Sequence, residues 1–217
     1  KVKIRISDTY DNAKTITFTN TVVSLVLQSN FDSTQVRTAG ATVTYTYIPI
    51  GSAEKTVYFI VDGTQIGTST VTASNVQQSY VLPAMNHGSH TLLVYFTAEI
   101  DGVEVRSNEL YYSIIVADSE STVPIISSPF RATTASQYET LQIPYTVYTP
   151  NSLYSPVTLY ANGTQISSEL TVDRTEQMWN YRADDSGSLT LKIATGSVEY
   201  TIALTITEAQ IDLSPGT

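Results

Sequence analysis

The sequence predicts an all-β protein that contains two tandem β-sandwich modules. Three observations support this prediction. Polar and apolar residues alternate with period two along segments such as ATVTYTYI, KTVYFIV and YTIALTI, as in half-buried strands. Turn signals such as Asp62-Gly63 and Asn162-Gly163 separate these segments at roughly ten-residue intervals. The chain of 217 residues also repeats part of its own sequence.

The repeat is clearest at DGTQI (residues 62–66) and NGTQI (residues 162–166), and it continues on both sides of this pair. It predicts module one at residues 21–117 and module two at residues 124–209, followed by a tail at residues 210–217. The linker at residues 118–123 is short and polar, so we expect the modules to lie end to end with limited freedom.

Residues 1–20 have the form of strand, turn and strand. They align loosely with LKIATGSVEYTIALT, the last hairpin of module two, so they are read as the closing hairpin of a further module upstream. An extra hairpin on module one remains the alternative, because short strand patterns are ambiguous. The chain begins KVKIRIS, without an initiator Met or a secretory signal, which favours a piece of a longer protein.

Composition excludes several classes of function. The net charge of −9 argues against a nucleic-acid partner, which requires a clustered basic surface. No run approaches the roughly 20 apolar residues of a membrane helix, so membrane insertion is not expected. The absence of cysteine removes disulfides, thiolate metal sites and cysteine nucleophiles.

Both modules resemble immunoglobulin-like sandwiches. VYFIVDGTQI and VTLYANGTQI match the segment that carries the family's tryptophan and the turn after it, with Phe59 and Leu159 at the tryptophan position. Tyr45 and Tyr145 fall near the first cysteine position, and DSGSLTL (residues 185–191) matches the late Asp-x-Gly-x-Tyr-x-Cys element. Both cysteines are replaced, so the resemblance implies cores that are held by packing alone.

Tyr- and Thr-rich tandem modules without disulfides are similar to immunoglobulin-like repeats of bacterial surface proteins and of bacteriophage tail or head fibres, especially gut-phage fibres with a lectin domain. The resemblance implies a non-catalytic spacer at the virion surface or the cell surface. The partners it implies are other domains or copies of the same protein. A module that binds carbohydrate or protein is the alternative function.

The repeat also predicts the core. We expect the turn glycines to allow the backbone conformation and Ile66 and Ile166 to re-enter the core after the turn. The residues expected in the two cores are Tyr45, Phe59, Leu92, Tyr145, Leu159, Trp179 and Leu191.

Candidate chemical sites are few. His87 and His90 lie three apart in NHGSH, which suggests a metal, but no third ligand type is near in sequence, so a structural role for His90 at the start of a strand is favoured. Asp184 and Asp185, with Asp173, could bind calcium, yet solvated turn carboxylates explain them better. The sequence thus predicts no metal and no cofactor.

Two further motifs have simpler explanations. Asn162-Gly163-Thr164 fits the N-glycosylation pattern, but a turn also explains Asp62 at the matching position. No nucleophile elbow or phosphate-binding glycine loop occurs, so no enzymatic activity is expected.

Tyrosine accounts for 15 of 217 residues, and tyrosine is favoured at interfaces and on glycan-stacking surfaces. Period two predicts an apolar outer face on module one only, while module two has Thr158, Tyr160, Lys192 and Ala194 there. We expect this face to pack against another chain or a neighbouring domain. Scattered surface tyrosines on an ordinary sheet remain the alternative. The predicted interface residues are Tyr58, Ile60, Leu93, Tyr95, Tyr111 and Ile115.

Overall fold

The computed structural model describes residues 2–7, 13–18, 25–51 and 53–209. Over these ranges the regular structure consists of strands alone, which confirms the all-β prediction. Within the same ranges there is no helix of the length and apolar character that a membrane crossing requires.

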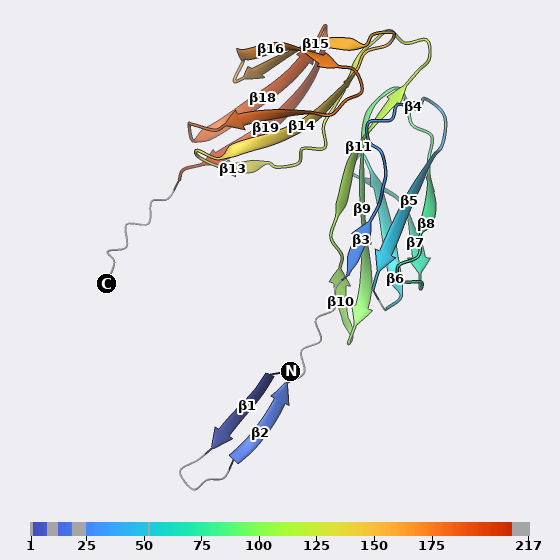
Figure 1. Cartoon of the computed structure of the whole chain (residues 1–217), viewed down its shortest axis with the longest axis vertical. Coiled ribbons are helices and arrows are strands. Elements are labelled where there is room, and N and C mark those ends of the chain that lie inside the picture. The colour runs from blue at the N-terminus through green and yellow to red at the C-terminus, as the bar shows by residue number, and fades with distance from the viewer. Residues whose placement is uncertain (1, 8–12, 19–24, 52, 210–217) are drawn as a thin grey trace, which may run out of the picture.

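Module one is a sandwich of two sheets, which are antiparallel except for one short parallel edge strand in the larger sheet (Figure 1). The smaller sheet has the order β3 (Val26–Gln28), β5 (Val43–Ile50), β8 (Gln78–Leu82). The larger sheet has the order β4 (Arg37–Thr38), β11 (Leu110–Ala117), β9 (Gly88–Ile100), β6 (Lys55–Val61), β7 (Thr64–Val71), and β10 (Val103–Arg106) also pairs with β9.

Module two repeats this topology. Its smaller sheet has the order β12 (Ile125–Ser127), β14 (Thr140–Tyr148), β17 (Gln177–Arg182). Its larger sheet has the order β13 (Thr134–Ser136), β19 (Val198–Thr207), β18 (Gly187–Thr195), β15 (Tyr154–Ala161), β16 (Thr164–Val172). One continuous strand, β19, takes the place of the pair β10 and β11. The repeated sequence therefore encodes one fold twice.

Upstream of module one, β1 (Val2–Ser7) and β2 (Ala13–Phe18) form an antiparallel hairpin of their own. These are the two strands that the sequence predicts; the turn expected between them lies outside the described residues, and both interpretations of the hairpin remain predictions. The predicted tail at residues 210–217 lies outside the described residues.

Each module encloses a core of alternating residues from its two sheets. The seven residues expected in the cores are all buried, with Trp179 the most exposed at 6%. In module one, the Tyr45 and Phe59 rings meet edge to face with their centroids 6.2 Å apart. The chain has no cysteine, so no disulfide supports these cores. Aromatic contacts such as this one are consistent with the prediction that packing alone holds them.

The repeated pentapeptide forms the same hairpin turn in both modules. Asp62 and Gly63 have φ values of 49° and 77°, and Asn162 and Gly163 have values of 47° and 79°. Two consecutive positive φ values define the tight hairpin turn that Asn-Gly and Asp-Gly favour. A shift of register follows at the same place in both hairpins, next to Phe59 and next to Leu159. The interpretation of Asn162 as a turn residue is therefore confirmed.

The return strand differs between the modules. Ile66 is half-buried against the module-one core, as predicted, but Ile166 is 51% exposed, so the prediction for module two was wrong. Trp179 stands at the repeat position of Tyr80 and is itself buried. The Trp179 ring belongs to the module-two core cluster, which does not include Ile166.

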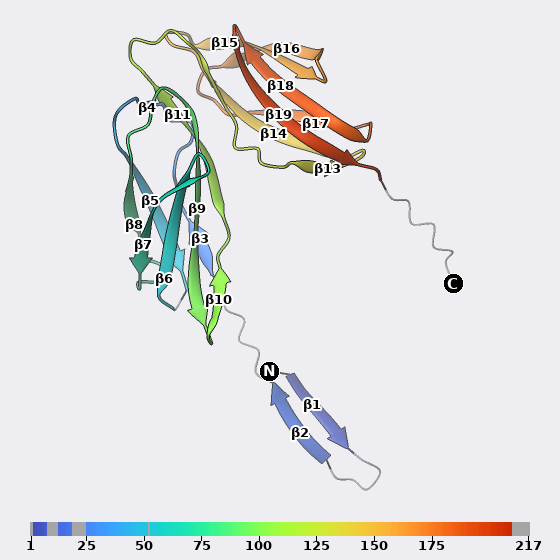
Figure 2. The same ribbon diagram turned by 180° about the vertical axis from the view of Figure 1, so that it is seen from behind.

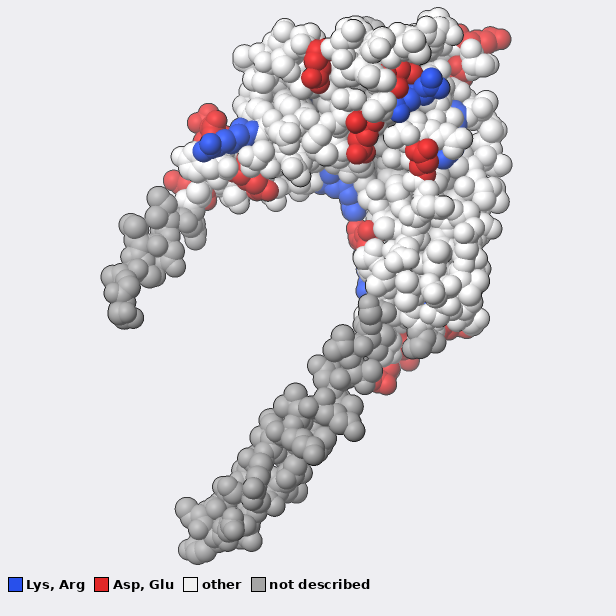
Figure 3. Space-filling model, viewed as in Figure 1, with Lys and Arg blue, Asp and Glu red and all other residues white. Residues whose placement is uncertain are grey.

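The two modules meet at a bend, as both views show (Figures 1 and 2). The modules meet beside the short linker, as expected from its length, but at an angle and not in a straight row. The physical reason is that β12, the first strand of module two, begins directly after the linker and contacts β9 and β11 of module one. The surface is sparsely charged, and most of the side in Figure 3 carries neither acidic nor basic residues.

Candidate interface and module junction

The predicted interface residues lie on the outer face of the larger sheet of module one. Tyr58 pairs with Tyr95 and Ile60 with Leu93 across β6 and β9, and Tyr111 of β11 pairs with Leu93 on the other side. Paired residues in a sheet share a face. The neighbouring Val57 and Phe59 point inward and are completely buried, so these five side chains point outward, where they are half-buried.

The lower part of this face is an aromatic stack. The Tyr58 and Tyr95 rings lie almost parallel, with 4.9 Å between their centroids. The Arg106 guanidinium lies 3.4 Å above the centre of the Tyr95 ring, and it also pairs with Glu109 at 2.6 Å. The two tyrosines therefore form an ordered surface that one arginine partly covers.

The upper part of the same face is covered by module two. Ile115 and Ala117 of β11 point outward, yet they are buried in one cluster with Ile125 of β12. Val36 and Tyr148 pack against this cluster from module one and module two, respectively. We call these five residues the junction cluster. A neighbouring domain of the same chain therefore buries Ile115, whereas Tyr58, Ile60, Leu93 and Tyr95 are only half-buried.

Polar contacts surround the junction cluster. The Ser89 and Ser127 hydroxyls share a hydrogen bond of 2.7 Å across the modules. The Arg131 guanidinium donates to Glu109 at 2.7 Å and lies 4.4 Å from the centre of the Tyr111 ring. Apolar burial inside and directed polar contacts at the rim are the usual composition of a specific interface.

The electrostatics of the rim follow from the Glu109 carboxylate. Its hydrogen bond from Arg131 is the strongest influence, and together with the charges of Arg106 and Arg131 it outweighs partial burial, so that the pKa of Glu109 is lowered. The pair is half exposed, so its contribution to stability is at most about 1 kcal/mol. The ion pair therefore sets the orientation of the modules more than their stability.

His87 binds the linker. Its Nδ1 accepts a hydrogen bond from the Asp118 N–H at 3.0 Å, which fixes the neutral tautomer with its proton on Nε2. The Ser121 hydroxyl lies 3.4 Å from that Nε2. The first residues of the linker are thus hydrogen-bonded to module one, although the sequence suggests only a polar spacer.

His90 has the structural role that the sequence favours. One ring nitrogen contacts Asp62 Oδ2 at 2.7 Å and the other contacts the Asn86 carbonyl at 2.9 Å. Partial burial opposes ionisation of Asp62, but the bonds from His90 and Thr91 outweigh it and lower the pKa of Asp62. Among the described residues, no three His, Asp or Glu side chains are placed to hold a metal ion.

The acidic residues of module two divide into two groups. Asp184 and Asp185 are exposed, as expected of turn carboxylates. Asp173 is buried, so the prediction of a solvated carboxylate was wrong for this residue. It accepts a hydrogen bond from the Thr149 N–H at 2.6 Å and pairs with Arg174 at 2.9 Å, and so it closes the loop between the two sheets.

Two structural residues escaped the sequence reasoning. Lys55 is completely buried, with its Nζ donating to the Ala53 and Ala73 carbonyls, and burial lowers its pKa. Period two could have predicted this, because Lys55 alternates in phase with the inward Val57. Asn108 bonds both the N–H and the C=O of Leu27, 81 positions away, and no local pattern signals that contact.

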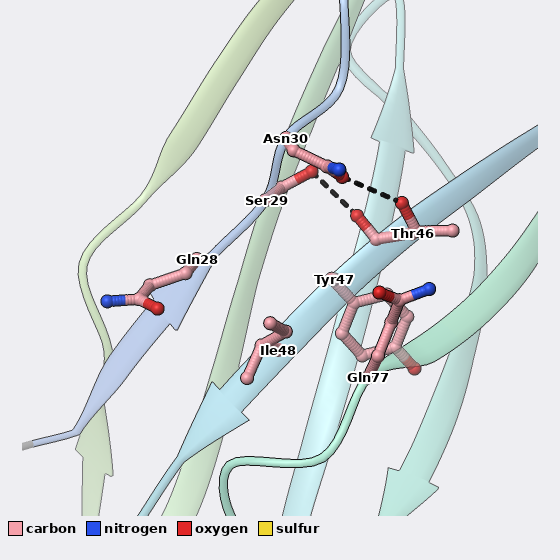
Figure 4. Close-up of a pocket in the computed structure, with 7 residues that line it drawn as sticks. All are labelled: Gln28, Ser29, Asn30, Thr46, Tyr47, Ile48 and Gln77. Carbon is pink, nitrogen blue, oxygen red and sulfur yellow. Dashed lines mark hydrogen bonds between the residues drawn. The ribbon is translucent and has the colours of Figure 1, made fainter.

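A small hollow lies between β3 and β5 of module one (Figure 4). Its volume of about 230 Å³ is smaller than the 300 Å³ at which ligand pockets typically begin. Several of its polar groups bond each other, since Ser29 donates to the Thr46 carbonyl at 2.6 Å and the Thr46 hydroxyl donates to Asn30 at 3.1 Å. The hollow therefore offers little to a ligand.

Known proteins resemble this chain in fold alone. No protein-family model matches the sequence, and no curated protein matches it either. Solved structures that match include tandem fibronectin III-like and immunoglobulin-like domains. The fibronectin(III)-like modules of Clostridium thermocellum CbhA are 16% identical over 89% of this chain and 99% of theirs, with a TM-score of 0.33. A chimeric titin Z1Z2 tandem is 17% identical over 87% of this chain and 100% of its own, with a TM-score of 0.35. Because these scores are low, the assignment of two tandem immunoglobulin-like sandwiches rests on the strand order and register.

Proposed function

We propose that the chain is a non-catalytic structural spacer that holds neighbouring domains at a fixed bend. The single observation that supports this function is the junction cluster. Ile115, Ala117 and Ile125 are each at least 93% buried, because module two contacts the outer face of module one. An interface of this kind restricts the relative motion of two domains, whereas an open polar linker would leave it free.

The setting we propose is a bacteriophage fibre or a bacterial surface protein, at the virion surface or outside the cell. Its partners would be other domains or copies of the same protein. The low charge density and the aromatic cores without disulfides support a robust extracellular repeat. Neither nucleic acid nor membrane insertion has a part in this function.

Small-angle X-ray scattering on the whole chain tests the spacer function. We expect Ile125→Ser to broaden the distribution of shapes, because it places a hydroxyl inside the junction cluster. Val123→Ser is the matched control, since Val123 lies two residues away in the chain and is 50% exposed. A wild-type protein whose scattering already requires many orientations of the modules would refute the proposal.

A second candidate function is binding of a glycan or protein on the lower outer face of module one. The stacked pair of Tyr58 and Tyr95 supports it, because flat aromatic surfaces are favoured at such contacts. Module two carries Thr158 and Ala194 at the repeat positions. The double variant Tyr58→Thr with Tyr95→Ala therefore replaces the aromatic surface by the residues that the same fold already carries in module two. A glycan array with the wild-type chain would show binding that this double variant loses. An array without any signal would count against this function.

A further inference from the structure

An exposed apolar patch occurs on module two at the open edge of its larger sheet. Tyr154 is 53% exposed, Leu170 is 67% exposed and Val172 is 49% exposed. Tyr154 pairs with Val172, and the exposed Pro156 pairs with Leu170, across β15 and β16. Paired residues share a face, so these four side chains form one surface, which we call the β16 patch.

Module one shows that the β16 patch is not a requirement of the fold. The repeat positions there, 100 residues earlier, hold Glu54, Thr56, Thr70 and Thr72, all polar. The two hairpins share their turn and their bulge. Since the same architecture is built with polar residues in module one, the apolar residues of module two must be explained by something outside the fold.

The backbone of β16 is also open to a partner. β16 is the last strand of its sheet, and in the described part of the chain it pairs with β15 alone. The Asp173 N–H donates to the Leu153 carbonyl, which directly precedes β15, at 3.0 Å. The backbone groups of Asp173 therefore point toward β15. Backbone groups alternate along an antiparallel strand, so those of Ser168, Leu170 and Val172 point away from the sheet. The open backbone groups and the exposed apolar side chains therefore belong to the same residues.

The surroundings of β16 favour a second copy of this chain. Natural edge strands are usually protected by charges or proline, and residues 168–172 have neither on the open side. The one acidic residue there, Glu169, accepts a hydrogen bond from the buried Tyr145 hydroxyl on the other face. Residues 150–172 contain no other charge, in a chain with a net charge of −9. Two copies can thus meet here without the repulsion that their net charge would produce elsewhere.

We propose that two copies of this chain associate through antiparallel pairing of β16 with β16 about a two-fold axis. In this arrangement Leu170 lies opposite Leu170 of the second copy, and Ser168 lies opposite Val172. The outward-pointing N–H and C=O groups of one β16 then hydrogen-bond to those of the other. The two five-stranded sheets become one, and the two β16 patches join on one face of it. Module two's β16 lies on the side away from module one in both views, so the bend leaves room for the second copy (Figures 1 and 2).

This proposal goes beyond the spacer function and does not depend on it. The β16 patch has four side chains, far fewer than the roughly 20–30 residues that each partner contributes to a standard interface. Association is therefore weak and depends on concentration. In a fibre or on a surface, where copies are held close together, a weak contact is sufficient to order them.

Sedimentation velocity over a series of concentrations tests the pairing on the full chain. The wild type should shift from monomer to dimer as its concentration rises. Leu170→Thr with Val172→Thr, which installs the module-one residues, should weaken the association about tenfold or more. Ser168→Pro removes one N–H that faces the second copy and no apolar side chain, and it should weaken the association similarly. Thr68→Pro, at the repeat position in module one, should leave it unchanged.

Amide hydrogen exchange gives a readout that needs no variant. The Leu170 and Val172 N–H groups should become protected as the concentration rises, while the Thr171 N–H, which faces β15, should be protected throughout. A wild type that stays monomeric overturns the proposal, and so does one that binds a glycan or another protein here instead. A dimer that survives Ser168→Pro, or one that Thr68→Pro abolishes, overturns the strand pairing.

Discussion

Asp62 and Asn162 stabilise equivalent turns in the two modules, and each uses its Oδ1 atom. Asp62 Oδ1 accepts a hydrogen bond from the Thr91 N–H, and Asn162 Oδ1 accepts one from the Thr190 N–H, both at 2.8 Å. Both residues also have positive φ, which Asn and Asp tolerate better than other residues with a side chain. The repeated turn therefore joins its hairpin to the neighbouring strand, 28 or 29 positions later in the chain.

We expect Asn162→Ala to lower the free energy of unfolding by about 0.5–1.5 kcal/mol, because it removes the hydrogen bond that the exposed Thr190 N–H donates. Asn162→Asp, which installs the module-one residue, should cost much less. Urea denaturation followed by fluorescence of Trp179 measures both changes. Equal losses for the two variants would show that the side-chain oxygen is not what matters.

The Asp62 contact with His90 predicts a dependence on pH. The pKa of Asp62 is lowered in the folded state, so its ionised form stabilises the fold above the ordinary value of about 3.8, and this stability is lost as the pH falls through the lowered pKa. Asp62→Asn should therefore cost stability at neutral pH, by less than about 1 kcal/mol because the group is half exposed. The difference should disappear in acid. A difference that persists unchanged at about pH 2 would contradict this account.

At the scale of elements, the hairpins β6–β7 and β15–β16 share a frame but differ in packing. In module one, the Tyr80 ring stacks on Phe59 with 3.8 Å between centroids, and Gly67 leaves the space for the Tyr80 hydroxyl. A methyl group on Gly67 would lie 2.0 Å from that oxygen. In module two, Ser167 and Trp179 occupy the repeat positions. The close packing of Gly67 against the Tyr80 hydroxyl therefore occurs in module one only.

We expect Gly67→Ala to destabilise module one by about 1–3 kcal/mol, since Tyr80 must leave its stacked position. Ser167→Ala is the matched control at the repeat position and should change stability by less than about 0.5 kcal/mol. Thermal or urea unfolding compares the two. If Gly67→Ala with Tyr80→Phe restores no stability, the proposed clash with the hydroxyl is wrong.

The elements that could be predicted from sequence were those with a local signature. Period two located the strands around Tyr45 and Phe59, and the Asp-Gly and Asn-Gly pairs located the hairpins. The short break between β10 and β11 had no such signature, because it depends on Ser107, whose N–H and hydroxyl bond the backbone of Phe96. The burial of Asp173 likewise depends on Thr149, 24 positions earlier. Contacts of this kind follow from the assembled fold.

At the scale of the whole molecule, the junction decides what two linked sandwiches can do. Ile115 could be placed on an outer face from its alternation, but period two does not say what covers that face. Its partner Ile125 lies just beyond the polar linker, where the sequence indicates only the start of the next module. Module two has Thr205 at the position that corresponds to Ile115 by strand pairing, and Thr205 is exposed. The apolar junction is therefore built once in the described chain.

The bend is the central claim, and a distance measurement across the junction tests it most directly. The chain has no cysteine, so two introduced cysteines can carry one spin label each. We choose Ser79→Cys in module one and Asn180→Cys in module two, both exposed positions on strands. Pulsed electron spin resonance on this doubly labelled protein should give one narrow distance distribution, which Ile125→Ser broadens and Val123→Ser does not. A broad distribution in the otherwise unchanged protein would contradict a fixed bend.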